Sequence, residues 1–376
     1  MDKISVLMVC ASLNLGGAEK VAQSIALHAP ENEFEFHFLV FHREEGPYES
    51  ALREKSCIIH RIPEPKDSYV RFIRNLRRLM TTYRFQVVHA HTMFNCGLIM
   101  LCAASCGVPV RISHAHSVLN VERNRFTRIY EQVMQLLLLH FSTDWVSCSS
   151  QAGERLLGKN KFRNHGLVIP NGIDVPAFRF SQEARNRIRA QYQLENCLVL
   201  GHIGRMVPVK NQAFLLYLLP LLLEQNPDVR LLLIGDGEDR PILEGKIQEL
   251  GIRNQVVFTG SVFYTADYLS AMDVFLFPSL FEGMPLALLE AQANGLPCVV
   301  SDSIAQDVFC TDLIHPLSLK ASSSEWCNTI LPLRRANPER YQKQLLSSVF
   351  SADRSAAKIL SLYKKGLYHD QNTLPH

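Results

Sequence analysis

Short apolar runs alternate with helical patterns through the first half of the chain. Such runs are typical of buried strands, and they lie at residues 4–10, 36–41, 86–90, 110–113 and 145–147. Apolar residues at helical spacing lie between or after these runs, at residues 18–28, 70–83, 95–106 and 128–141. Alternation of this kind predicts an α/β fold, in which helices cover both faces of a parallel sheet.

The alternation stops at the turn-rich segment VIPNGIDVPAF and then starts again. The pattern predicts two doubly wound domains of similar size, residues 1–178 and 179–352, with residues 304–345 less regular. Ligands of such sheets bind at the carboxyl ends of the strands, so two facing sheets predict an interdomain cleft. The second domain is expected to have strands at 198–205, 231–237, 256–260, 274–278 and 297–301, and helices at 211–224, 239–250, 267–271 and 285–294.

The run FPSLFEGMPLALLEAQANGLPCVVSD predicts the end of a strand, a loop, a helix that begins at Pro285, and another strand. The helix is apolar on nearly every side, so the carboxylate of Glu290 within it needs a partner. No lysine or arginine lies within two turns of Glu290, whereas two adjacent hydroxyls of a ligand would both donate to one carboxylate. Glu282 lies in the loop, beside the N–H groups of a helix N-terminus, where anions bind. The run therefore predicts a site for a phosphorylated sugar; the alternative is a capped helix with a surface glutamate.

Two cations follow the first strand of the second domain. Lys210 stands just before a helix, where the positive end of the helix dipole disfavours a cation, and Arg205 lies five residues earlier. We therefore expect both side chains to face an anion. In the first domain, Gly16 and Gly17 link a strand to a helix, and glycine allows the backbone to approach a phosphate closely. A simple tight turn explains these two glycines equally well, and the GxGxxG dinucleotide fingerprint is absent from the sequence.

The spacing Glu282-x7-Glu290 within EGMPLALLEAQANGLP resembles the signature of the retaining family 4 glycosyltransferases of the GT-B fold. The resemblance covers nearly the whole chain. It implies two Rossmann-like domains, with the acceptor side in residues 1–178 and the nucleotide-sugar side in residues 179–352. It also implies that a C-terminal helix within residues 353–376 crosses back to the first domain.

The same resemblance implies roles for particular residues. Glu282 is expected to act in catalysis, Glu290 to bind the donor, and Arg205 with Lys210 to hold the donor diphosphate. A histidine after a strand of the first domain contacts the donor sugar in this family. His114 matches that position best, and the remaining expected contacts with donor, sugar or acceptor are Gly16, Gly17, His91, His116, Gly283, Met284, Pro285 and Leu286.

Metal and cofactor are not expected. The turn Gly235-Asp236-Gly237 resembles a turn of the family, but it lacks the second acid of a DxD metal motif. We found no other metal-ligand spacing in the sequence. The nucleotide sugar is then a co-substrate, and the reaction is expected to be independent of metal.

The resemblance thus predicts transfer of a hexosyl unit from a nucleoside diphosphate sugar, with uridine diphosphate (UDP) as the expected carrier. The acceptor is expected to be a glycan or lipid-linked glycan of a bacterial surface polysaccharide, and the anomeric configuration to be retained. Two alternatives stay open at this point: a nucleotide-sugar 2-epimerase of the GT-B fold, and a non-catalytic subunit that binds nucleotide sugars.

Composition and charge narrow the setting. The net charge of +3 gives no general affinity for nucleic acid, and the ten scattered cysteines indicate a reduced, cytoplasmic protein. Residues 1–178 carry 20 basic and 16 acidic residues, a net charge of +4 for the first domain alone. The excess of positive charge of the chain therefore lies in the first domain.

Residues 70–84, VRFIRNLRRLMTTYR, predict peripheral docking on an anionic membrane at the inner face of the plasma membrane. The alternative is an ordinary helix that packs on the sheet with a solvated basic face. The apolar stripe of this helix is Phe72, Ile73, Leu76, Leu79, Met80 and Tyr83, and its basic side is Arg71, Arg74, Arg77 and Arg78.

Overall fold

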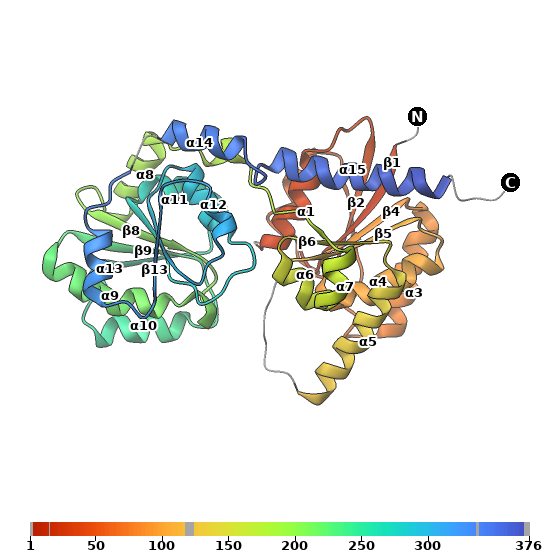
Figure 1. The fold of residues 1–376 in the computed structure, drawn as a ribbon, viewed down its shortest axis with the longest axis horizontal. Helices are drawn as coiled ribbons and strands as arrows, with labels where there is room; N and C mark the ends of the chain where they lie inside the picture. The colour runs from red at the N-terminus through yellow and green to blue at the C-terminus, as the bar shows by residue number, and fades with distance from the viewer. Residues whose placement is uncertain (1–2, 15, 117–123, 336–337, 372–376) are drawn as a thin grey trace. The chain divides into compact units, whose positions relative to one another are not determined.

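The computed structural model divides the chain into two compact units, each with its own parallel sheet and flanking helices (Figure 1). Unit 1 spans residues 1–172 and 352–376, and unit 2 spans residues 173–351. The structure describes residues 3–14, 16–116, 124–335 and 338–371. The sequence pattern predicted the first division after 178, six residues later, because the turn-rich segment has no sharp end, and the second after 352, one residue later.

The sheet of unit 1 has seven strands, and each adjacent pair is parallel. Their spatial order is β3-β2-β1-β4-β5-β6-β7. The strands are β1 (Ile4–Val9), β2 (Phe34–Val40), β3 (Ile58–Arg61), β4 (Val87–Ala90), β5 (Val110–Ala115), β6 (Asp144–Ser147) and β7 (Leu167–Val168).

Helices cover both faces of this sheet, since alternate residues of a buried strand point to opposite sides. Val6 and Met8 face a core that includes α1 and Tyr363 of α15, whereas Leu7 and Val9 face a core that includes α3 and α4. The helices are α1 (Gly17–Leu27), α2 (Glu49–Glu54), α3 (Tyr69–Tyr83), η1 (Met93–Asn95), α4 (Cys96–Ser105), α5 (Arg125–Phe141), α6 (Ser150–Leu157), α7 (Lys159–His165) and α15 (Ala352–Gln371). Helix α15 thus packs in unit 1, although the chain passes through all of unit 2 before reaching it.

The apolar stripe of α3 lies in the core of unit 1. Phe72, Leu76 and Met80 are buried, whereas the side chains of Arg71, Arg74 and Arg78 are exposed. The helix therefore packs on the sheet with a solvated basic face. The centre of its apolar stripe is therefore not available to a membrane, although Tyr83 at its end is exposed, and this bears on the docking predicted for residues 70–84.

The sheet of unit 2 has six parallel strands in the order β10-β9-β8-β11-β12-β13. They are β8 (Leu198–Ile203), β9 (Val229–Ile234), β10 (Val256–Gly260), β11 (Val274–Phe277), β12 (Cys298–Ser301) and β13 (Ile314–Leu317). The strand order reverses between β8 and β11, and in unit 1 between β1 and β4. Ligands of open α/β sheets bind beyond the carboxyl ends of the strands at such a switch point.

The helices of unit 2 include two in the segment whose sequence pattern is less regular. Residues 304–345 contain the short elements β13, α13 and most of α14, which the pattern did not predict. The elements are η2 (Val175–Phe178), α8 (Gln182–Tyr192), η3 (Pro208–Lys210), α9 (Gln212–Gln225), α10 (Arg240–Glu249), η4 (Arg253–Gln255), α11 (Thr265–Ala271), α12 (Leu286–Ala293), η5 (Gln306–Val308), α13 (Ser323–Ile330) and α14 (Pro338–Leu346). Of the helices that the structure describes, none has the length and apolar character needed to cross a membrane.

A largely buried ion-pair cluster fixes the start of β11. The Asp273 carboxylate accepts hydrogen bonds from Arg185 and Arg189, each at 2.6 Å, and from the Val199 N–H at 2.8 Å. Burial raises the pKa of Asp273, but the Val199 N–H and the two guanidinium groups outweigh this effect and lower the pKa overall. The cluster therefore joins α8 to the two central strands of the unit 2 sheet.

We expect Asp273→Asn to lower the free energy of unfolding of unit 2 by roughly 3 kcal/mol, because it leaves two arginines without their charge partner. Urea unfolding followed by fluorescence measures this in a Trp145→Phe background, where Trp326 of unit 2 is the remaining tryptophan. The matched control is Asp312→Asn, which breaks an exposed pair with Arg340 and is expected to cost less than about 1 kcal/mol. Equal effects of the two substitutions would contradict the assignment.

Candidate active site

The loops that follow β8 and β9 are packed against each other in unit 2. The Met206 N–H donates to the Asp236 carbonyl at 2.9 Å, and the Asp239 N–H donates to the Met206 carbonyl at 3.0 Å. Gly235 has a φ of 127° and lies so close to Gly204 that a Cβ there would stand 2.2 Å from the Gly204 carbonyl oxygen. The Gly-Asp-Gly turn therefore supports the loop that carries Arg205.

An ion pair joins the loops that follow the two switch-point strands. Lys210 Nζ lies 2.6 Å from Glu282 Oε1, with side chains 20% and 12% exposed. The Leu280 N–H donates to the Val209 carbonyl at 2.8 Å, and Asn211 Nδ2 donates to the Pro278 carbonyl at 3.2 Å. We expected Lys210 to face an anion, and in this structure that anion is the carboxylate of Glu282.

Arg205 lies in the same loop but points to solvent. Its guanidinium pairs with Glu238 at 3.1 Å, and both side chains are 70% exposed. An exposed pair of this kind contributes little, so the guanidinium is able to turn towards a ligand at small cost. The main chain beneath it is held more firmly, because Gln212 Nε2 donates to the Arg205 carbonyl at 3.0 Å.

Helix α12 begins at Leu286 with Pro285 as its N-cap, one residue later than the sequence predicted. The first N–H groups of a helix have no partner within the helix and carry its positive dipole end. Gly283 and Met284 lie just before Pro285 and are partly buried, and the Glu282 side chain before them is largely buried. The arrangement is suited to an anion that touches the start of α12 and Lys210 together.

Glu290 lies on α12 and is 4% exposed. The Thr265 hydroxyl at the start of α11 donates to Glu290 Oε2 at 3.3 Å. No signal in the sequence pointed to this partner, because Thr265 lies 25 residues away and threonine carries no charge. A hydroxyl thus already donates to this carboxylate, which is the kind of contact that we predicted for a ligand.

His202 is a polar residue of the site that sequence reasoning missed. It lies next to the last residue of β8, and its Nδ1 is 2.9 Å from the Leu276 carbonyl. Burial lowers its pKa to about 4, so the ring is neutral at pH 7. Its Nε2 has no hydrogen-bond partner in the described part of the chain. A histidine in the otherwise apolar run LVLGHI was the available signal.

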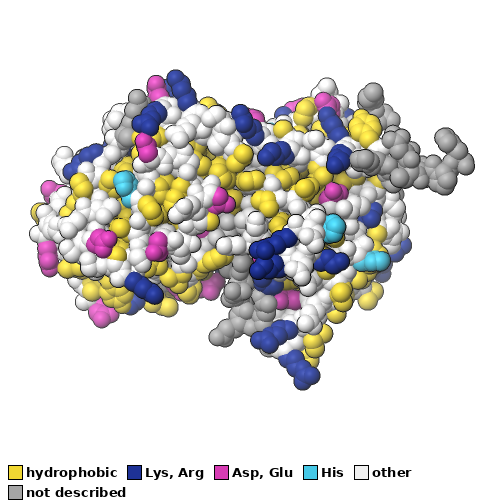
Figure 2. Space-filling model, viewed as in Figure 1, with side chains coloured by type: hydrophobic (Ala, Val, Ile, Leu, Met, Phe, Trp, Pro, Cys, Tyr) yellow, Lys and Arg dark blue, Asp and Glu magenta, His cyan; other side chains and the backbone are white. Residues whose placement is uncertain are grey.

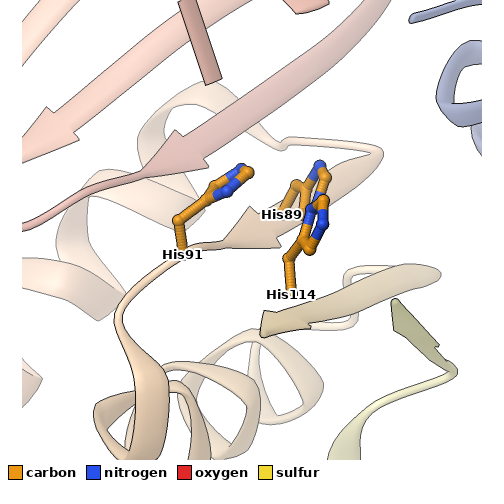
Figure 3. A group of neighbouring side chains, drawn as sticks. All are labelled: His89, His91 and His114. Atoms are coloured by element: carbon orange, nitrogen blue, oxygen red, sulfur yellow. The ribbon is translucent and has the colours of Figure 1, made fainter. Parts of the chain in front are cut away.

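Four histidines of unit 1 stack at the ends of β4 and β5. His89 and His91 come from β4 and the residue after it, and His114 and His116 come from β5 and the residue after it. The ring centroids of His114 and His116 are 4.0 Å apart. Those of His89 and His114, both drawn in Figure 3, are 5.2 Å apart, and the two rings are nearly parallel. Residues two apart on a strand share a face, and the two strands are neighbours, so the four rings meet.

A chain of hydrogen bonds runs from α15 through these rings. His89 Nδ1 is 2.6 Å from the Tyr363 hydroxyl, and His89 Nε2 is 3.1 Å from His114 Nδ1. The Tyr363 hydroxyl also lies 3.6 Å from Met8 Sδ, a weak acceptor. If its single proton goes to the sulfur, His89 Nδ1–H donates to Tyr363 and His114 Nδ1–H donates to His89; if it goes to His89 Nδ1, both directions reverse. His114 Nε2 has no protein partner among the described residues.

Burial keeps these imidazoles neutral. It lowers the pKa of His89 and of His116 to about 3, the latter against a smaller opposing effect of Asn171. It also holds the pKa values of His91 and His114 well below their ordinary value, with the neighbouring imidazoles adding to the effect. A second pair in the stack joins His91 Nδ1 to His116 Nε2 at 2.7 Å. The group is therefore a set of hydrogen-bonding imidazoles rather than a set of cations.

Ligand atoms of His89, His91 and His114 all lie within 4.8 Å of one another, and neutral imidazole is a common metal ligand. The sequence did not show this group because its members come from two strands. A metal would take His89 and His114 out of the hydrogen bond that joins them, and a tetrahedral site needs a fourth ligand. We therefore interpret the group as a hydrogen-bonded network, and independence of metal stays a prediction.

In the glycine-rich loop of unit 1, Gly16 lies against the carboxylate of Glu19, from the first turn of α1. Helix α1 begins at Gly17, and a Cβ at Gly16 would stand 2.2 Å from Glu19 Oε2. Burial raises the pKa of Glu19, and a hydrogen bond from its own N–H opposes this in part. The carboxylate thus folds back over the helix N-terminus, where we expected phosphate. Contact of Gly16 and Gly17 with a donor stays a prediction.

Two family models match the chain. A model described as Glycosyltransferase Family 4 matches residues 15–176, and a model described as Glycosyl transferases group 1 matches residues 197–319. The first match lies within unit 1, apart from its last four residues, and the second lies within unit 2.

Known proteins resemble the chain over nearly its full length. The putative glycosyltransferase EpsF of Bacillus subtilis is 32% identical over 98% of this chain and 98% of that protein. The capsular polysaccharide biosynthesis glycosyltransferase CapH of Staphylococcus aureus is 26% identical over 88% of this chain and 90% of that protein. The crystal structure of Alr3699/HepE of Anabaena in complex with UDP superposes on this chain with a TM-score of 0.78. The match covers 97% of this chain and 100% of the Anabaena chain, and the two sequences are 19% identical. These matches confirm the predicted family and the GT-B fold.

Acid should destabilise unit 1, because its buried histidines resist protonation in the folded state. In the folded state His89 and His116 keep pKa values of about 3, against an ordinary value of 6.5, so the unfolded chain takes up protons first as the pH falls. Below about pH 6.5 each such histidine is expected to cost roughly 1.4 kcal/mol per pH unit. Thermal unfolding of a Trp326→Phe variant, followed by Trp145 fluorescence, should show a falling midpoint between about pH 7 and pH 5.

The matched pair of variants is His89→Gln, in the stack, and His140→Gln, whose side chain is exposed on α5. The first should make the midpoint less dependent on pH, and the second should leave that dependence unchanged. A midpoint for unit 1 that does not change over this range of pH would contradict the neutral network.

Proposed function

This chain belongs to glycosyltransferase family 4, and from that premise we propose that it transfers a hexosyl unit from a UDP-sugar with retention of anomeric configuration. The acceptor in this proposal is a glycan or lipid-linked glycan of a bacterial surface polysaccharide. The relatives named as glycosyltransferases favour transfer over the 2-epimerase and the non-catalytic subunit. UDP as the carrier is supported by the UDP held in the Anabaena structure, and a polysaccharide product by the name of CapH.

The observation that carries the proposal is the Lys210–Glu282 pair at the switch point of unit 2, beside the start of α12. An ammonium group has three N–H donors, so Lys210 is able to keep Glu282 and still bind a phosphate oxygen. In our proposal the diphosphate lies against Lys210 and the first N–H groups of α12, and Arg205 turns from Glu238 to reach it. Negative charge grows on the diphosphate as the glycosidic bond breaks, and these groups would stabilise it.

We assign the donor ribose to Glu290. Its buried carboxylate accepts from the Thr265 hydroxyl, and a ribose diol would provide two more donors of the same kind. Charge-assisted hydrogen bonds of this type are worth about 1.5–3 kcal/mol each when the partner is removed. Glu290 would therefore contribute to donor affinity, whereas Arg205 and Lys210 would contribute most in the transition state.

In unit 1 we assign a contact with the transferred sugar to His114, as the family resemblance implies. His114 Nε2, without a protein partner among the described residues, is suited to form a hydrogen bond with a sugar hydroxyl, and a neutral ring is suited to lie beside a developing positive charge at the sugar carbon. In this proposal His89 and Tyr363 are positioning residues, because they hold the ring and its tautomer.

Analysis of the product anomer by NMR tests the reaction. Release of UDP that depends on an acceptor, with the anomeric configuration of the donor kept in the product, is expected with and without a chelator. An inverted product, or activity that is abolished by chelator and restored by magnesium, would overturn retention or independence of metal, respectively.

Glu290→Gln should weaken UDP binding by about tenfold or more, because a neutral amide accepts hydrogen bonds from the ribose less strongly. Isothermal titration calorimetry with UDP measures the affinity, and thermal unfolding checks that the fold is kept. The control is Glu325→Gln, an exposed glutamate of α13 in the same unit. An unchanged affinity for UDP in the Glu290 variant would remove Glu290 from the site.

Arg205→Ala and Lys210→Ala should lower kcat more than they weaken binding of the donor, since the charge that they meet grows in the transition state. Lys210→Ala should have the larger effect, because it also leaves Glu282 without its partner in a largely buried site. Arg230→Ala is the control, since Arg230 bonds only main-chain carbonyls near the start of β9 in the described structure. Full turnover in both single variants would contradict the assignment.

A further inference from the structure

Helix α5 in unit 1 exposes an apolar stripe that nothing in the described part of the chain covers. Its opposite side packs in the core through Met134 and Leu138. The exposed positions follow one another at spacings of three and four residues, so they form one stripe along the helix. They are Phe126 at 82% exposure, Ile129 at 51%, Val133 at 45% and Leu136 at 67%.

Single exposed apolar side chains are ordinary on protein surfaces, but a stripe of four on one helix is not. The α3 helix of the same unit shows the contrast, because its apolar residues Phe72, Leu76 and Met80 are buried. Both helices are amphipathic in sequence. In α3 the exposed large hydrophobics, Tyr69, Val70 and Tyr83, lie at the two ends of the helix, whereas those of α5 follow one another along it.

Basic side chains flank the stripe. Arg125 and Arg128 are exposed at the start of α5, and Arg71, Arg74 and Arg78 are exposed on α3. Helix α3 contains no acidic residue, and the single acid of α5, Glu131, pairs with Arg155 at 3.3 Å. The charge of the two helices therefore has one sign.

The two helices form one surface of unit 1. Helix α4 packs against both of them. Tyr69, the first residue of α3, lies beside Tyr130 of α5, where burial first and then this neighbour raise the pKa of Tyr130 to about 12. The lower edge of unit 1, where Figure 1 places α5, carries hydrophobic side chains next to Lys and Arg side chains (Figure 2).

We propose that the exposed face of α5, with the basic side of α3, docks unit 1 on an anionic lipid bilayer. Phenylalanine and aliphatic side chains enter the boundary between headgroups and acyl chains, while arginines bind the headgroups through long, flexible stems. A second copy of the chain is a poorer occupant, since it would present the same basic surface without acidic groups to match it. In this proposal α5 makes the apolar contact with the membrane, and α3 contributes only arginines that bind the headgroups.

Vesicle co-sedimentation tests the proposal with the full chain. The vesicles contain phosphatidylcholine alone or with phosphatidylglycerol, and the salt is low or about 0.5 M, where charges are screened beyond a few ångströms. The apolar variant is Phe126→Ser with Leu136→Ser, and the charge variant is Arg125→Gln with Arg128→Gln. The control is Tyr217→Ser with Ile242→Ser, which removes two unit 2 side chains that are 54% and 59% exposed.

Wild type and control should bind the vesicles that contain phosphatidylglycerol, and high salt should weaken this binding. Each of the two α5 variants should lower the association constant about tenfold or more, with an unchanged thermal unfolding midpoint. Wild type that ignores these vesicles at low salt, or α5 variants that bind as well as wild type, would overturn the proposal. Wild type that sediments as a dimer in free solution, with the apolar variant a monomer, would also overturn it, because a second copy would then cover the stripe. Vesicle binding does not depend on the donor site, so failure here leaves the proposed reaction standing.

Discussion

The ion pair between Lys210 and Glu282 is the interaction on which the donor side of this protein depends. It joins the loops after β8 and β11, the two strands that flank the switch point of the unit 2 sheet. Taking two charges out of water is costly, and a buried pair adds little stability compared with well-packed apolar residues. We therefore interpret the pair as a device that holds a cation beside the start of α12, where a cation alone would be unfavourable.

The polar groups of the two candidate sites differ in charge. Unit 2 holds charges: a lysine, an arginine and two glutamates lie in or beside the loops at the carboxyl edge of its sheet. Unit 1 holds neutral groups: four stacked imidazoles whose pKa values burial has lowered, and a tyrosine that burial keeps protonated. Charged groups suit a diphosphate leaving group, and neutral rings suit a sugar. The Tyr363–His89 contact ties the imidazoles to α15, so the end of the chain helps to fix them.

The sequence predicted the central strands well, because their apolar runs are unbroken. It missed the short edge strands β3 and β7, and also β13, whose residues are only partly buried. Helix α3 and helix α5 show a second limit. Both have amphipathic patterns and both bury apolar residues, and only the packing of the folded unit decides that α5 also leaves an apolar stripe exposed. The choice of α3 for the membrane followed from its apolar stripe and its row of arginines, and neither signal reports burial.

The family signature and the charged residues of the site could also be predicted, because their spacing along the chain is local. Thr265 and Tyr363 could not, since each meets its partner across a long stretch of sequence. A crystal structure of the protein with UDP bound tests the account most directly. The account predicts a diphosphate oxygen within hydrogen-bond distance of Lys210 Nζ and of an N–H in the first turn of α12, with both ribose hydroxyls on the Glu290 carboxylate. A nucleotide bound elsewhere, or a ribose that does not touch Glu290, would contradict it.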